Sequence, residues 1–254
     1  MRNKLKIEQE WEKEHFDHIA RKYERQYGYN DPFTKYKFKK KTDKFVSLID
    51  LCFENKVGLR ILEIGCGTGA YTVRYSQRLP KAKIVAIDIS GEMIKIAREK
   101  HRVRKNLLYQ KKSAYETGFK SSSFDVVCGF YILHHLNLKA AIKEIDRVLK
   151  PGGVVYFYEP NILNPLVFLI KSSQFLKILI GDSSEEWAIN PLTVQKEWNK
   201  FKVIELIITE FVWPLSFIPF KTKLLLDKLT SSLFPAIPGL KLIGGSIEIC
   251  LRKK

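Results

Sequence analysis

Hydrophobic and polar positions change their period along the chain. Aromatic and aliphatic residues recur every four positions between Trp11 and Tyr23, which predicts an amphipathic helix over residues 7–27. After a Gly/Asn/Pro turn, a second helix is expected over residues 33–55. Short apolar runs then alternate with helical segments, and this alternation predicts a parallel sheet covered by helices on both faces.

The expected strands are short apolar runs at 60–64, 83–87, 107–110, 124–129, 154–158, 203–209 and 246–251. The helices between them are expected at 70–79, 91–104, 138–149 and 190–201. Two apolar, proline-containing stretches do not fit the alternation, and we interpret 160–189 and 211–244 as insertions. Both would emerge at the carboxyl edge of the sheet, where open α/β sheets bind ligands.

The net charge of the chain bears on which partners it could bind. The chain has 254 residues, with Lys+Arg 44 against Asp+Glu 27, so its formal net charge is +17. An anionic partner such as RNA or a membrane surface must therefore be considered. The densest basic run, Lys35 to Lys41, is interpreted as a solvated helix face.

The cysteines and the apolar segments limit the compartment. The four cysteines are far apart, with no pair at zinc spacing, which fits a reduced compartment such as the cytoplasm. The polar N-terminal segment predicts no secretory signal, and no apolar stretch is long enough to predict a membrane-spanning helix.

Glycines mark the first candidate binding site. Gly65, Gly67 and Gly69 lie between an expected strand and an expected helix. Glycine allows a tight turn and a close approach of backbone to ligand, and the helix start offers free N–H groups. Asp88 ends the next strand, where a carboxylate can accept hydrogen bonds from both hydroxyls of a ribose. Its alternative role is to cap the helix that begins near Gly91.

Several motifs in order give the chain a family resemblance. They lie at residues 62–69, 86–94, 123–127, 133–136 and 147–153. With them the chain resembles the class I S-adenosylmethionine-dependent methyltransferases, and residues 16–23 are similar to the lid helix of the quinone-biosynthesis subset. The resemblance implies a Rossmann-like α/β fold with seven mostly parallel strands. A helical lid (1–56) would precede the methyltransferase domain (57–254).

The resemblance also implies the cofactor, S-adenosylmethionine, with S-adenosylhomocysteine as its product. Glu63 and the glycine loop would lie near the amino-acid end of the cofactor, Asp88 at the ribose, and Ile89 and Met93 beside the adenine. The full expected set is Tyr23, Glu63, Gly65, Cys66, Gly67, Gly69, Asp88, Ile89, Met93, Ser113, Ala114 and Phe130. Ser113 stands where the family has an aspartate, so we expect weaker adenine binding. Tyr23 either closes over the cofactor or only packs within its helix.

Candidate catalytic residues follow the fourth and fifth strands. His134, His135 and Glu159 could act as a general base, which is needed only if the acceptor atom starts protonated. Alternatively, the histidines pack at the strand end and Glu159 accepts backbone hydrogen bonds. No metal site is expected.

Several functions remain open at this level. The first is methylation, at oxygen or carbon, of a hydrophobic or lipid-like acceptor, with the insertions forming a tunnel or a lid in peripheral contact with a membrane. The insertions could instead pack on each other or form a dimer interface, so monomer and homodimer both remain open. The alternatives are a small polar metabolite or sugar, RNA, which is disfavoured because no RNA-binding module is appended, and a cofactor-binding protein without catalysis.

Overall fold

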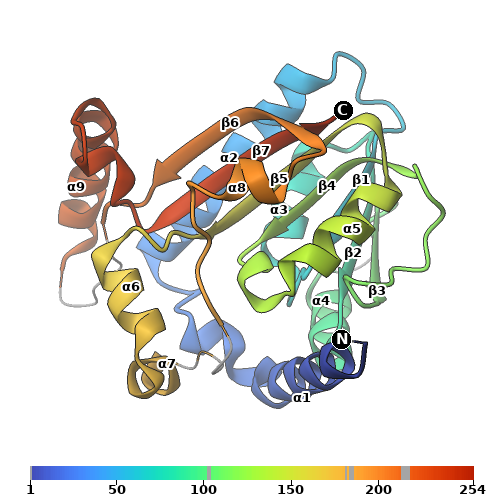
Figure 1. Ribbon diagram of the computed structural model, residues 1–254, viewed down its shortest axis with the longest axis horizontal. Coiled ribbons are helices and arrows are strands. Elements are labelled where there is room, and N and C mark those ends of the chain that lie inside the picture. The colour runs from blue at the N-terminus through green and yellow to red at the C-terminus, as the bar shows by residue number, and fades with distance from the viewer. Residues whose placement is uncertain (1, 102–103, 181, 183–185, 213–217) are drawn as a thin grey trace.

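A single seven-stranded sheet organises the molecule (Figure 1). The computed structural model describes residues 2–101, 104–180, 182, 186–212 and 218–254. The strands are β1 (Arg60–Ile64), β2 (Lys83–Asp88), β3 (Leu107–Lys111), β4 (Phe124–Phe130), β5 (Leu149–Pro160), β6 (Phe201–Thr209) and β7 (Ser246–Lys253). Their order is β3-β2-β1-β4-β5-β7-β6, and β7 alone runs in the direction opposite to the other six strands. The predicted α/β fold is confirmed.

The central strands are buried on both faces, as continuous apolar runs require. On one face, α2 (Pro32–Cys52) and α3 (Ala70–Arg78) contribute Phe45 and Tyr75 to a core with Phe130 and Tyr156. On the other face, α5 (Leu138–Val148) and α8 (Val194–Glu197) cover a second core. The helix α4 (Gly91–Lys100) packs beside β2 and β3.

The helix predicted over residues 190–201 is wrong in extent, because only the four residues of α8 are helical. Trp198 ends the helix and is buried against Phe157 and Phe201, with ring centroids 5.9 and 5.1 Å away. Phe201 already pairs with Lys253 as the first residue of β6. Strand pairing therefore ends the helix early.

The two expected insertions are helical. The first contains α6 (Pro165–Ser172) and α7 (Gln174–Ile180), and the second contains α9 (Phe220–Leu233) with the short turns η2 (Phe234–Ala236) and η3 (Leu240–Leu242). They follow β5 and β6, which are parallel because both pair antiparallel with β7, so both start at the carboxyl edge. Figure 1 shows them on one side of the molecule. Among the described residues, no helix is long and apolar enough to cross a bilayer.

The N-terminal helix α1 (Arg2–Gln26) is fastened to the sheet through α4. Asp17 Oδ1 accepts hydrogen bonds from the hydroxyl of Ser90 and from the backbone N–H of Glu92, 3.1 Å away. This carboxylate therefore lies at the N-terminus of α4, where negative charge is favoured. The contact holds α1 beside the carboxyl edge of the sheet.

Candidate active site

The glycine loop after β1 leaves backbone exposed to a cavity. Gly65 has φ +64°, and a Cβ there would lie 2.3 Å from the side chain of Ile132, so packing alone requires glycine. Gly67 has φ +53°, but nothing lies within 4 Å of the position of its Cβ. The N–H of Gly67 donates to Asp88 Oδ2 at 2.8 Å. Gly67 therefore leaves open space in which a ligand can approach the loop.

Asp88 is held by backbone donors at the end of β2. Its Oδ1 accepts from the N–H of Ser90 at 2.9 Å and its Oδ2 from Gly67, and burial raises its pKa. The cap of α4 is Ser90, whose hydroxyl accepts from the N–H of Met93 at 3.1 Å. Each oxygen of Asp88 retains a second acceptor direction, which suits the paired hydroxyls of a ribose.

The first cavity lies between this loop and α1. Nine of the twelve expected cofactor residues line it, namely Tyr23, Gly65, Cys66, Gly67, Asp88, Ile89, Met93, Ala114 and Phe130. Glu8, Gln9, Glu12 and Phe16 close it from α1, although no motif in that helix marks the first three. The gap beside Gly67 and the diol-sized acceptor pair of Asp88 fit an adenosyl cofactor.

The other three expected cofactor residues lie outside the lining of this cavity. Glu63 is buried and accepts from the Tyr75 hydroxyl at 2.7 Å, and burial raises its pKa to about 7. Gly69 is the N-cap of α3, and a Cβ there would lie 2.4 Å from the Tyr109 hydroxyl. The Ser113 hydroxyl accepts from the side chain of Gln9. Their cofactor roles remain predictions.

A second, larger cavity adjoins the first. Six residues line both cavities: Phe16, Tyr23, Tyr29, Tyr71, Tyr131 and His135. The first five are phenylalanine or tyrosine. Beyond this junction, apolar side chains from α6 such as Val167 and Ile170 line the second cavity. Lys37 and Lys41 also line it, and both are buried. The interpretation of the Lys35–Lys41 run as a solvated face is therefore wrong for these two lysines.

His134 and Glu159 form a hydrogen-bonded pair. His134 Nδ1 lies 2.7 Å from Glu159 Oε2, so Nδ1 carries the proton, because a carboxylate can only accept. Glu159 is fully buried, and its Oε1 also accepts from the backbone N–H groups of Ile132 and Leu133. Burial and the neighbouring His135 lower the pKa of His134, which lines the second cavity with its ring.

His135 lies between two carboxylates. Its Nδ1 is 3.4 Å from Glu12 Oε2 and 3.3 Å from Glu186 Oε1. Against the opposing effect of burial, Glu186 and Glu12 raise the pKa of His135 to about 10, so it is an imidazolium at neutral pH. Sequence reasoning missed both glutamates, because they lie in distant segments and belong to no motif.

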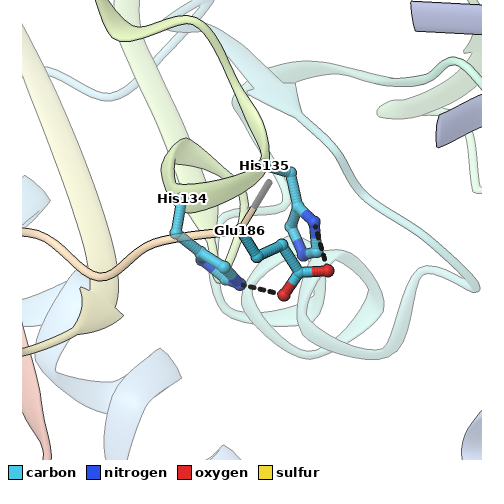
Figure 2. A group of neighbouring side chains, drawn as sticks. All are labelled: His134, His135 and Glu186. Carbon is cyan, nitrogen blue, oxygen red and sulfur yellow. Dashed lines mark ion pairs between the residues drawn. The ribbon is translucent and has the colours of Figure 1, made fainter. Parts of the chain in front are cut away.

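Figure 2 shows Glu186 between the two histidine rings of η1 (Leu133–His135). The ligand atoms of His134, His135 and Glu186 lie within 4.8 Å of one another, a spacing that could hold a cation. However, Lys171 Nζ is 3.1 Å from Glu186 Oε2, and its ammonium repels a metal ion at this position. The expectation of no metal stays a prediction.

Comparison with known proteins agrees with this geometry. The family described as methyltransferase domain matches residues 62–157. Demethylmenaquinone methyltransferase of Staphylococcus aureus is 35% identical over 106 residues, covering 41% of this chain and 44% of that relative. The chain thus matches less than half the length of this relative.

Two solved structures share the fold at low sequence identity. Magnesium protoporphyrin IX methyltransferase from Synechocystis, with bound S-adenosylhomocysteine, has a TM-score of 0.66 at 15% identity, covering 97% of this chain and all (100%) of that chain. An N-methyltransferase from Bradyrhizobium japonicum, also with S-adenosylhomocysteine, has a TM-score of 0.54 at 14% identity, covering 88% of each chain. Residues 62–157 thus match the methyltransferase domain family, and together with the glycine loop, Asp88 and the strand order these likenesses support a class I S-adenosylmethionine-dependent methyltransferase.

Proposed function

We propose that this protein transfers a methyl group from S-adenosylmethionine to an oxygen or carbon of a hydrophobic, lipid-like acceptor. The observation that carries the proposal is the second cavity, which adjoins the cofactor cavity. It is lined by seven phenylalanine and tyrosine residues and by Val167, Ile170 and Val212, together with six charged residues. Such a lining favours apolar ligands fixed by a few polar groups. The relatives named for demethylmenaquinone and for magnesium protoporphyrin IX support an acceptor of this kind.

The aromatic junction between the cavities suits the reacting centre. When bound, the cofactor supplies a methyl group on a cationic sulfonium, and aromatic faces attract cations at short range. Phe16 and Tyr23 from the lid helix, and Tyr131 after β4, lie on both cavities. A methyl group placed among them would face the acceptor cavity. In-line transfer then depends mainly on positioning.

We assign the base role to His134 and a positioning role to Glu159. Glu159 keeps the proton on Nδ1 of His134, which leaves Nε2 as a proton acceptor near the second cavity. His135 does not suit this role, because its two carboxylate neighbours keep it protonated. An acceptor hydroxyl would thus lose its proton to His134 as the oxygen attacks the methyl carbon.

The helix α9 has an inverted amphipathic arrangement. Leu225, Leu229 and Leu233 are 57%, 48% and 57% exposed, whereas Lys223 and Asp227 are buried. Asp227 accepts from Lys40 Nζ at 2.8 Å, so the polar face of α9 is directed to the protein and its leucines to the outside. A helix that packs on a protein core normally has the opposite arrangement.

The helices α6 and α7 show the same inversion. Phe168, Phe175 and Ile178 are exposed, whereas Lys171 and Lys177 are buried. Among the described residues of 165–180 and 220–243, every exposed charged side chain is a lysine, namely Lys221, Lys228 and Lys241. An apolar surface with basic residues matches an anionic bilayer. We therefore propose that this surface rests on the membrane from which a lipid-like acceptor is taken.

A labelling experiment tests the proposed activity. The protein is incubated with methyl-labelled S-adenosylmethionine and cell extract, and the label is then partitioned between organic and aqueous phases. We expect label in the organic phase that disappears with Asp88→Ala. Label confined to the aqueous phase would refute the lipid-like acceptor, and nuclease treatment would then separate RNA from a small metabolite.

A vesicle experiment tests the membrane surface. Sedimentation with vesicles containing phosphatidylglycerol should exceed sedimentation with pure phosphatidylcholine, and the double variant Leu225→Ser/Leu229→Ser should abolish the difference. Leu51→Ser is the matched control, because Leu51 is also an exposed leucine but lies on α2. Equal sedimentation of wild type and the double variant would contradict the proposal.

A further inference from the structure

A buried charged cluster lies at the wall of the acceptor cavity. Lys37 and Lys41, one turn apart on α2, place their Nζ atoms 3.1 and 3.2 Å from Glu210 Oε1. Lys41 Nζ is also 2.7 Å from the Tyr131 hydroxyl. The other oxygen of Glu210 accepts from Tyr131 at 2.8 Å and from Ser246 at 2.6 Å. All five side chains line the cavity.

The charges of this cluster do not balance. Glu210 provides one negative charge between two ammonium groups, and both of its oxygens are already occupied. Among the described residues, Glu248 on β7 is a further acid near Lys41, but burial raises its pKa to about 7, so only about half of it is ionised at pH 7. Lys40 pairs instead with Asp227. The cavity wall therefore keeps an excess positive charge, which is costly in a buried place unless an anion joins it.

Two residues of the cluster have strained backbones. Tyr131 and Glu210 have φ of 58° and 63°, in the left-handed region that side-chain-bearing residues rarely adopt. Such strain persists where the surrounding structure requires it, and it concentrates at ligand sites. Both strained residues direct their side chains to Lys41.

We propose that Lys37 and Lys41 bind an acidic group, a carboxylate or a phosphate, carried by the hydrophobic acceptor. The inference rests on the proposed function, since it places the acceptor in this cavity. The apolar part of the ligand would lie against Val167 and Ile170, and its oxyanion would accept hydrogen bonds from the two ammonium groups. Because Tyr131 lies both in this cluster and at the junction with the cofactor cavity, the acidic group also orients the acceptor toward the methyl donor.

The experiment compares three probes of equal chain length: tetradecanoate, tetradecyl phosphate and neutral tetradecanol. Titration calorimetry on the protein with S-adenosylhomocysteine bound should give at least tenfold tighter binding for one of the two anions than for the alcohol, as charge-assisted hydrogen bonds imply. Whichever anion binds more tightly identifies the acidic group. If tetradecanol binds as tightly as both anions, the proposal is overturned.

Substitutions of single lysines test whether Lys37 and Lys41 are responsible for anion binding. Lys37→Gln and Lys41→Gln should each weaken anion binding about tenfold and leave tetradecanol unchanged, because each keeps one lysine paired with Glu210. Lys40→Gln, on the same helix but paired outside the cavity, should bind like wild type. An equal loss in Lys40→Gln would overturn the proposal. Unchanged S-adenosylhomocysteine binding shows that a variant is folded, and Lys41→Arg should retain the anion if Lys41→Gln does not fold.

The pH dependence of anion binding gives a test that needs no variant. Burial lowers the pKa of Lys41 to about 8 although Glu210 opposes the shift. Anion affinity should therefore fall as the pH rises through 8, while tetradecanol affinity stays constant. Constant anion affinity up to pH 10 would refute a role for Lys41. If the probes bind as expected but no extract acceptor is labelled, the subsite stands and the proposed methyl transfer fails.

Discussion

Replacing Gly67 with alanine separates backbone strain from ligand contact. Gly67 and Gly58 have φ of 53° and 74°, and at neither does any atom lie within 4 Å of the position of a Cβ. Gly67 lines the cofactor cavity, whereas Gly58 lies before β1, outside it. Each alanine must adopt a left-handed backbone, which costs about 1–2 kcal/mol of unfolding free energy. For a chain of this size the melting temperature should fall by roughly 2–8 °C in both variants.

Only one of the two variants should lose cofactor affinity. The added methyl group at Gly67 occupies space that the cofactor needs, so S-adenosylhomocysteine should bind at least about tenfold more weakly, equivalent to about 1.4 kcal/mol. Gly58→Ala should bind it like wild type. Calorimetric titration gives both dissociation constants, and thermal unfolding gives both stabilities. Equal affinities in the two variants would refute our reasoning that the cofactor lies against Gly67.

Three further predictions concern the lid, the base and a buried acid. Asp17→Ala removes two hydrogen bonds to the N-terminus of α4, so amide exchange in α1 should accelerate and S-adenosylhomocysteine should dissociate several-fold faster, whereas unchanged exchange would contradict the tethering role. His134→Gln should lower kcat by about 10²–10⁴, and in wild type kcat should fall only below about pH 6.5, because burial lowers the pKa of His134. An unshifted pH profile in His134→Gln would remove it from catalysis. The pKa of Glu63 is raised from its ordinary 4.5 to about 7 in the fold, so it favours folding below pH 4.5 and this contribution is lost as the pH rises through 7. Glu63→Gln should therefore gain stability relative to wild type between pH 5 and pH 8 in denaturant titrations, and no gain would show that Glu63 is not protonated in the fold.

The sheet was predictable because its strands are continuous apolar runs and its loops carry family motifs. The surfaces built by α6, α7 and α9 were not, because periodicity shows that a helix has two faces but does not show which face is buried. The sequence places Leu225 and Leu229 on one stripe, yet the structure buries the opposite one, with Lys223. The partners of that buried face, Phe33 and Lys40 on α2, are far away in sequence.

The residues of the candidate site also fall into two groups, those that the sequence predicts and those that it does not. Gly67 and Asp88 lie next to each other in a local strand–loop–helix unit, and such units have sequence signatures. By contrast, Glu186 meets His135, and Glu210 meets Lys41, only through tertiary packing of segments that are distant in sequence. A side chain within a motif can also be directed elsewhere, as Glu63 is, because neighbouring strand residues alternate between faces.

The position of β7 has a consequence for the order of folding. Although it follows β6 in the chain, it lies between β5 and β6, so β6 has no partner in the sheet until β7 is available. The five parallel strands that carry the glycine loop and Asp88 can pair before that point. Glu210 and Ser246, which follow β6 and begin β7, are brought together only afterwards. During synthesis on the ribosome, the half that carries the proposed cofactor site can therefore assemble while the wall of the proposed acceptor cavity is still incomplete.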